Sequence, residues 1–128
     1  MKKKVLVTGG AGFIGSHTVD ELISQGYSVR VYDNLNPQVH GEGAEKPDFL
    51  HPDAEFIKGD VRDRDHLHQS IKDIDLIIHD AAEVGVGQSM YSIDQYISTN
   101  VQGTGLLWDI LVNEKHKVEK VLVASSMS

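Results

Sequence analysis

The feature that most constrains the fold of this chain is a regular alternation of short apolar runs with helical segments. Apolar runs lie at 4–10, 28–32, 54–60, 75–79 and 120–125, and the segments between them are helical in spacing or rich in turn residues. Parallel strands need a crossover between them, so this alternation predicts a parallel sheet. Right-handed crossovers then make the sheet doubly wound. We therefore expect an α/β fold with a doubly wound, Rossmann-type parallel sheet in which five strands are visible.

Helical spacing is clearest over 13–25, 62–73 and 92–113. Gly26 directly follows the first segment, at the position where a glycine often ends a helix. The inner face of this first segment is predicted to hold Ile14, Val19, Leu22 and Ile23. The inner face of the last segment is predicted to hold Ile93, Ile97, Val101, Thr104, Leu107, Trp108 and Leu111. The runs 75–79 and 121–124 are predicted to be buried strands, the former on both faces.

Composition excludes several classes of function. The net charge is −7, which disfavours nucleic acid as a partner. There is no cysteine, so disulfides and thiolate metal sites are impossible. The seven histidines show no ligand spacing with a third partner, and we expect no metal. No run approaches the roughly 18 apolar residues of a membrane span, so we expect no membrane contact and a cytoplasmic location.

A glycine-rich turn, "TGGAGFIGS" (8–16), joins the first strand to the first helix. It contains Gly10-x-Gly12-x-x-Gly15 and, in a second frame, Gly9-x-x-Gly12-x-x-Gly15. Such glycines allow a tight turn, close approach of a pyrophosphate to the backbone, and packing of the helix against the sheet. The helix N-terminus offers N–H groups to the phosphates. A purely structural glycine turn is the alternative, but the position between strand and helix favours a dinucleotide site.

An acid follows at the end of the second strand, as a dinucleotide site requires. Asp33 lies 18 residues after Gly15 and could accept hydrogen bonds from the adenosine ribose hydroxyls. A carboxylate there repels the 2′-phosphate of NADP, so NAD is favoured. Asp60-Val61 and Ala81-Ala82 follow the third and fourth strands, where they could meet the adenine and the cofactor, although each pair alone is more typical of an ordinary turn, by about two to one.

Several motifs together resemble one known family over the whole chain. "VLVTGGAGFIGS", "YDNL", "GDVRD", "HDAAEVGVGQSMY", "YISTNVQGTGLLWDIL" and "VLVASSMS" occur in this order. They are similar to the N-terminal part of the extended short-chain dehydrogenase/reductase family, in its nucleotide-sugar epimerase and dehydratase group. The resemblance implies NAD as cofactor and a nucleotide sugar, UDP- or dTDP-linked, as substrate.

The resemblance also implies a role for individual residues. It places Gly9, Gly12, Phe13, Ile14 and Gly15 at the pyrophosphate, Asp33 and Asn34 at the adenosine ribose, Asp60 and Val61 at the adenine, Ala81, Ala82 and Glu83 beside the nicotinamide half, and Asn100 at the family's "NxxGT" asparagine. Ser125 would support the cofactor. Ser126 would be the catalytic hydroxyl, bonding to the sugar O4.

Two departures from the family pattern bear on activity. The Tyr-x-x-x-Lys pair that supplies the family's base does not occur in these 128 residues. His79-Asp80 is the other departure, because an apolar or amide residue is commoner in the family at the position of Asp80. We therefore expect residues 1–128 to form an incomplete NAD-binding domain, with no second domain, that is inactive by itself.

The resemblance leaves three functions open. The leading one is the NAD-binding portion of a nucleotide-sugar 4-epimerase, acting on dTDP-L-rhamnose or a UDP-hexose. A 4,6-dehydratase or a reductase could use the same scaffold, although the Thr-Asp-Glu run typical of dehydratases is absent after residue 124. A non-catalytic NAD-binding module is the alternative from another class. A homodimer is implied by resemblance only.

Overall fold

The structure is a computed structural model that describes residues 2–35, 48–80 and 102–124. Within these ranges the elements follow the chain as β1 (Lys4–Thr8), α1 (Phe13–Ser24), β2 (Ser28–Asp33), β3 (Glu55–Lys58), α3 (Arg64–Ser70), β4 (Leu76–His79), α6 (Gly103–Asn113) and β5 (Lys120–Val123). Each strand and helix lies within or close to its predicted segment, and residues 92–101 of the last predicted helix lie outside the described ranges. None of the helices described here is long and apolar enough to cross a membrane.

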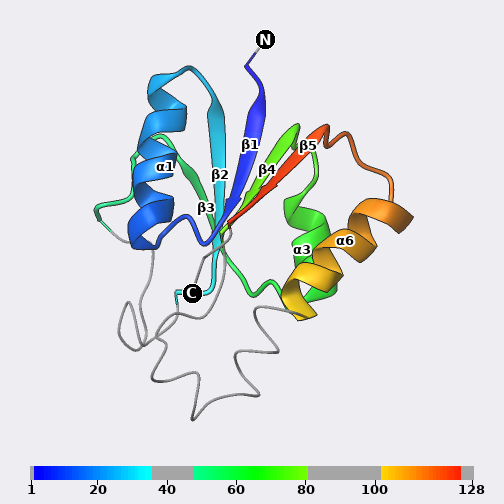
Figure 1. Ribbon diagram of the computed structural model, residues 1–128. Coiled ribbons are helices and arrows are strands. Elements are labelled where there is room, and N and C mark those ends of the chain that lie inside the picture. Colours follow the sequence, from blue (N-terminus) through cyan, green and yellow to red (C-terminus); the bar gives the residue numbers. More distant parts are fainter. Residues whose placement is uncertain (1, 36–47, 81–101, 125–128) are drawn as a thin grey trace.

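The five strands form one parallel sheet in the order β3-β2-β1-β4-β5 (Figure 1). From β1 the chain builds outward through β2 and β3, and then it returns to the other side of β1 for β4 and β5. This doubly wound topology confirms the predicted fold class. The strand order reverses between β1 and β4, and ligands of such sheets bind at the carboxyl ends of the strands beside that reversal.

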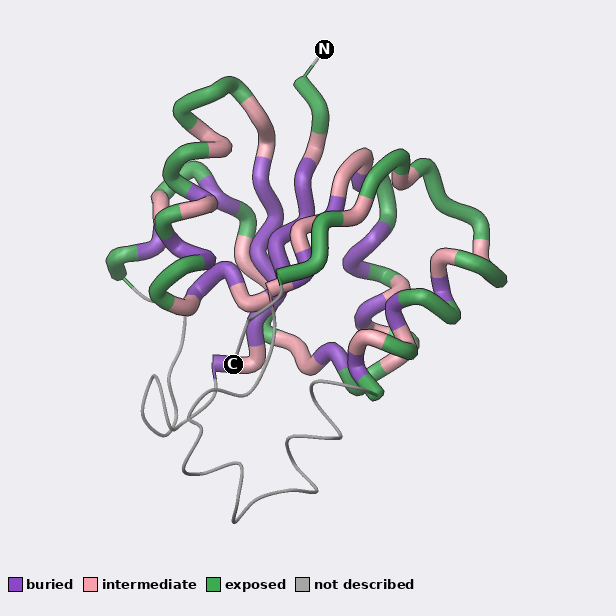
Figure 2. Tube along the Cα trace, in the orientation of Figure 1, coloured by how far each residue is buried: buried purple, intermediate pink, exposed green. Residues whose placement is uncertain are grey.

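Two apolar clusters cover the two faces of the sheet. Val5 and Val7 of β1 point to one face and pack in a cluster with Val19 of α1. Leu6 points to the other face, where its cluster includes residues of α3 and α6 such as Leu107. Figure 1 shows α1 on one side of the sheet and α3 with α6 on the other, and Figure 2 shows the buried segments along β1 and β2 between them. Alternation along β1 thus divides the core in two.

Strands β4 and β5 are less buried than predicted. In β4, Ile77 is buried, but Leu76 and Ile78 on the opposite face are only partly buried, because α1 packs mainly over β1 and β2. In β5, Leu122 is 61% and Val123 47% exposed, so the prediction of a buried strand was wrong. Its pairing in the described part of the chain is with β4 alone, which makes β5 an edge strand.

Two predicted helix faces were also partly wrong. In α6 the buried positions are Gly103, Leu107 and Ile110, whereas Trp108 is 45% exposed. Trp108 follows Leu107 by one residue and is therefore rotated by about 100° from the buried stripe. In α1 the buried stripe runs through Gly15, Ser16 and Val19, and Ile14 points away from it.

Candidate functional site

The glycine turn directly follows β1 at the carboxyl edge of the sheet. Gly9 has a φ of 72°, a conformation that glycine adopts without strain. Its N–H donates to the carbonyl of Tyr32 (2.8 Å), which ties the turn to β2. A Cβ on Gly15 would collide with the Gly9 carbonyl oxygen and the Gly10 Cα. Glycine at these two positions therefore lets α1 begin directly against the turn.

The N-terminus of α1 has the features of an anion site. Gly12 is the N-cap residue and makes no side-chain capping bond, and the first turn contains no acidic residue. The first N–H groups of a helix lack intrahelical acceptors and carry a partial positive charge. The side chains of Phe13 and Ile14 are 80% and 67% exposed, so their predicted contribution to phosphate binding would come from their backbone.

Asp33 joins the glycine turn to the end of β2. Its carboxylate is buried and accepts the N–H of Ala11 (3.0 Å) at Oδ2 and the N–H of Leu35 (2.7 Å) at Oδ1. Leu35 has a φ of 53°, a left-handed conformation that this bond helps to hold. Each carboxylate oxygen has two acceptor positions, and among the described residues each oxygen of Asp33 accepts one backbone N–H.

Asp60 lies after β3 and is held from several directions. Arg62 donates to its carboxylate from Nε (2.9 Å to Oδ1), from Nη2 (2.5 Å to Oδ2) and from the backbone N–H (2.8 Å to Oδ1). These bonds with Arg62 are the main reason that the pKa of Asp60 is lowered, and the nearby Asn34 side chain lowers it further. Asn34, predicted at the ribose, thus lies near the predicted adenine ligand.

Val61 belongs to the core rather than to the surface of the site. Its side chain is 4% exposed and packs with Leu107 of α6 in the same cluster. Gly103 lies so close that a Cβ there would stand 2.6 Å from Val61 Cγ2. A contact between Val61 and a bound adenine would therefore use the backbone. α6 starts directly over the loop that carries Asp60.

His79 is a buried connection that sequence reasoning noted only as part of a family departure. Its Nδ1 lies 2.7 Å from the Thr8 hydroxyl of β1, and its Nε2 lies 2.9 Å from the Thr104 hydroxyl of α6. Burial lowers the pKa of His79 to about 4, so the ring is neutral near pH 7. The signal in the sequence was a histidine ending an otherwise apolar strand.

Asp80 adds a second carboxylate to this edge of the sheet. Its N–H donates to both the carbonyl (3.1 Å) and the hydroxyl (3.0 Å) of Thr8. Burial raises the pKa of Asp80, and the negative charge of Asp33 raises it further. The edge beside β1 and β4 therefore combines a helix N-terminus with two acidic groups.

Six of the predicted site residues lie outside the described part of the chain, namely Ala81, Ala82, Glu83, Asn100, Ser125 and Ser126. Among the residues that are described, no group of three or more histidine, aspartate or glutamate side chains could hold a metal ion.

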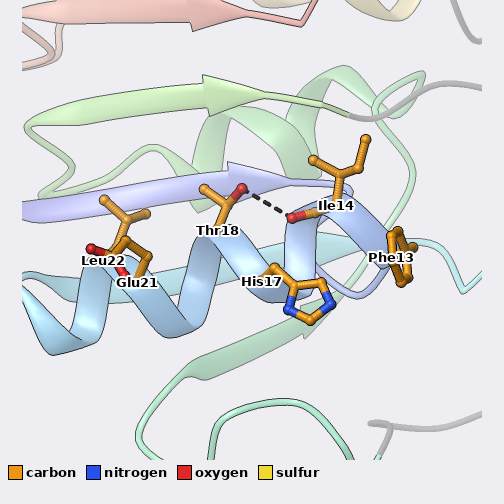
Figure 3. A pocket seen from close by; sticks show the side chains of 6 residues that line it. All are labelled: Phe13, Ile14, His17, Thr18, Glu21 and Leu22. Carbon is orange, nitrogen blue, oxygen red and sulfur yellow. Dashed lines mark hydrogen bonds between the residues drawn. The ribbon is translucent and has the colours of Figure 1, made fainter.

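A surface hollow lies along α1; it shares Phe13 and Ile14 with the glycine turn and extends along the helix to Leu22. Its lining residues are Phe13, Ile14, His17, Thr18, Glu21 and Leu22 (Figure 3). All six come from this one helix, and neither Asp33 nor Asp60 lines it. The hollow therefore lacks the two carboxylates of the predicted dinucleotide site, which lie at the carboxyl ends of β2 and β3 instead.

Comparison with known proteins points to one family. The model described as "NAD dependent epimerase/dehydratase family" matches residues 5–128. The dTDP-L-rhamnose 4-epimerase of Burkholderia thailandensis is 41% identical over 97% of this chain and 34% of its own length. The chain thus spans about a third of the length of this curated relative.

Solved structures agree in fold. A UDP-glucose 4-epimerase of Thermotoga maritima with UDP-glucose matches with a TM-score of 0.82 and 34% identity, over 96% of this chain and 38% of that one. A UDP-glucose 4-epimerase of Brucella ovis in complex with NAD matches with a TM-score of 0.81 and 34% identity, over 98% of this chain and 36% of that one.

Proposed function

Because this chain belongs to the NAD dependent epimerase/dehydratase family, we propose that it binds NAD at the carboxyl edge of its sheet, as the cofactor-binding portion of a nucleotide-sugar 4-epimerase. The placement of Asp33 carries this proposal. Its buried carboxylate bonds to the glycine turn at Ala11 and lies at the end of β2, where an adenosine ribose is bound in folds of this type. The 4-epimerase part is supported by the names of the relatives.

The described residues fit the adenosine half of NAD. The pyrophosphate would lie against the first N–H groups of α1, beside Gly12. The ribose hydroxyls would donate to Asp33, and the exocyclic amine of the adenine to Asp60. The nicotinamide half would lie beside Ala81, Ala82 and Glu83, and Asn100 and Ser125 would be further cofactor-binding residues.

Bound NAD supplies a hydride acceptor and donor for the sugar C4, and the protein supplies binding and orientation. In this proposal Ser126 donates or accepts a hydrogen bond at the sugar O4. The family's Tyr-x-x-x-Lys pair does not occur among these 128 residues. We therefore expect this polypeptide to bind NAD without epimerising a nucleotide sugar.

The proposed partners follow from the same relatives. A UDP- or dTDP-linked hexose is the proposed substrate class, in line with the names of the matched epimerases. A homodimer through the helix that ends at Asn113 is also part of the proposal. The exposure of Trp108 (45%) and Val112 (78%) on α6 supports it.

Amide chemical-shift mapping with NAD tests the proposed site. We expect the largest shifts at Gly9–Gly15, Asp33 and Asp60. The matched reference is the outer side of α3 and α6, where Arg64 pairs with Asp109 and no shift is expected. Shifts centred on Thr18 and Glu21 would instead assign binding to the α1 hollow, and the proposed site would be wrong.

A further inference from the structure

The loop after β3 is built to fix one carboxylate. The carbonyl of Asp60 accepts the Tyr32 hydroxyl (2.8 Å) and the N–H of Asp63 (3.0 Å). Gly59 lies so close to the Tyr32 ring that a Cβ there would be 2.5 Å from ring carbon Cζ. Tyr32 is fully buried in the core, so the backbone that carries Asp60 is anchored to the sheet.

The carboxylate itself is fixed by Arg62. The guanidinium donates from both Nε and Nη2, the two-bond arrangement that gives an arginine–carboxylate pair a defined orientation. The pair is partly exposed, with 36% of the Arg62 and 30% of the Asp60 side chain accessible. Exposed ion pairs contribute little to stability, so the pair has more consequence for orientation than for folding.

We propose that Arg62 is a positioning residue that holds the Asp60 carboxylate ready to accept the exocyclic amine of the NAD adenine, and so sets the preference for adenine over bases that lack this donor. This inference rests on the proposed function. A carboxylate has about four acceptor positions, and the bonds from Arg62 fill most of them. The three N–H groups of Arg62 bind both carboxylate oxygens. The amine would bind at the remaining acceptor position and leave the charged pair intact.

The test compares NAD with nicotinamide hypoxanthine dinucleotide, in which an oxygen replaces the exocyclic amine. We expect the wild type to prefer NAD about tenfold, the loss expected for one hydrogen bond to a charged group. Arg62→Gln should reduce this preference to about threefold or less, and Asp60→Asn should remove it. Arg62→Lys should fall between, because a lysine lacks the fork. Arg64→Gln removes the same charge two residues away and should leave the preference unchanged.

The ratio of the two affinities separates positioning from folding, because a merely destabilised loop weakens both ligands equally. If Arg62→Gln keeps the wild-type ratio while Asp60→Asn removes it, Arg62 does not position Asp60 and the inference is overturned. If Asp60→Asn also keeps the ratio, no amine contact exists for Arg62 to support. Absence of NAD binding by the wild type would overturn the proposed function, and this inference with it.

A second measurement needs no ligand. Carboxyl carbon shifts of Asp60 are followed against pH in the wild type, Arg62→Gln and Arg64→Gln. We expect a higher titration midpoint in Arg62→Gln alone. Asp63, Tyr32 and His66 are the other titratable groups packed against this loop in the described part of the chain, and all three are kept in every variant. An unchanged midpoint would show that the pair does not form and would overturn the inference whatever NAD does.

Discussion

At the scale of single residues, the carboxylates of Asp33 and Asp80 lie at the same edge of the sheet but differ in how their negative charge is compensated. The Asp33 carboxylate is held by the backbone N–H groups of Ala11 and Leu35, so its charge is compensated where the ribose is proposed. Asp80 receives no such help from the contacts described here, and its pKa is raised by burial and by Asp33. A pyrophosphate bound at α1 would add negative charge near both.

We predict that Asp80→Asn strengthens NAD binding by about threefold at pH 8, the scale of one screened charge–charge repulsion. The gain should shrink as the pH falls through the raised pKa of Asp80, because the wild-type carboxyl then becomes neutral as well. Calorimetric titration in a pH series downward from 8 measures this. Asp20→Asn on the exposed side of α1 is the control for loss of one charge, and weaker binding by Asp80→Asn would show that this carboxylate contacts the cofactor favourably.

The residues whose roles could be predicted are those with a distinctive chemistry at a fixed distance from a strand. Gly9, Gly15 and Asp33 belong to this group, and the structure places them together at the end of β1 and β2. The roles of Arg62 and His79 were not predicted. The partner of Arg62 lies in the same loop, and the partners of His79 lie 71 and 25 residues away along the chain. Neither kind of polar pair leaves a periodic signal in the sequence.

At the scale of elements, the start of α6 depends on one close contact. A Cβ on Gly103 would stand 2.6 Å from Val61 Cγ2, whereas nothing in the described part of the chain lies within 4 Å of a Cβ on Gly105. Close packing thus accounts for the glycine at 103, and the described residues give no packing reason for the glycine at 105.

These two glycines form a matched pair for a stability measurement. Gly105→Ala should raise the free energy of unfolding by up to about 1 kcal/mol, the helix propensity difference. Gly103→Ala gains the same propensity but overpacks against Val61, and we expect a net loss of about 1–2 kcal/mol. Urea denaturation measures both. Equal effects of the two substitutions would contradict the close packing of α6 on Val61.

His79 links three elements, and its titration should affect stability. The unfolded ring binds a proton below about pH 6.5, but the buried ring binds one only below about pH 4, so the unfolded state holds more protons between these values. Stability should therefore rise with pH across this window, by up to roughly 3 kcal/mol, and level off above it.

The contribution of His79 is isolated by comparison with His79→Gln, which cannot gain the proton. Denaturation curves at pH 4.5, 5.5 and 7 should show a steeper pH dependence for the wild type than for the variant. The other histidines are present in both proteins, so the comparison isolates His79. Parallel pH dependences would mean that the imidazole is not buried between Thr8 and Thr104.

Element order was predictable because it depends on local periodicity, but burial at the margins of the sheet was not. β5 was predicted to be buried from its apolar letters, yet Leu122 and Val123 are exposed because the strand lies at the edge. The buried side of α6 was shifted by one residue, with Ile110 inside and Trp108 outside. Apolar residues alone do not tell which neighbour will cover them.

At the scale of the whole molecule, the site follows from topology. The strand order of the sheet reverses between β1 and β4. The carboxyl ends of its strands carry the glycine turn, Asp33, Asp60, His79 and Asp80. The chain spans about a third of the length of the matched epimerases, and the described part contains the residues proposed for the adenosine half of a dinucleotide site. We therefore expect these residues to bind NAD.

Calorimetric titration of the 128-residue protein with NAD and with NADP tests whether these residues bind NAD. We predict measurable binding of NAD, at least about tenfold weaker binding of NADP because its 2′-phosphate meets Asp33, and a smaller difference in Asp33→Asn but not in Asp20→Asn. The claim would be contradicted by NADP binding as tightly as NAD to the wild type, or by no heat of binding at millimolar NAD.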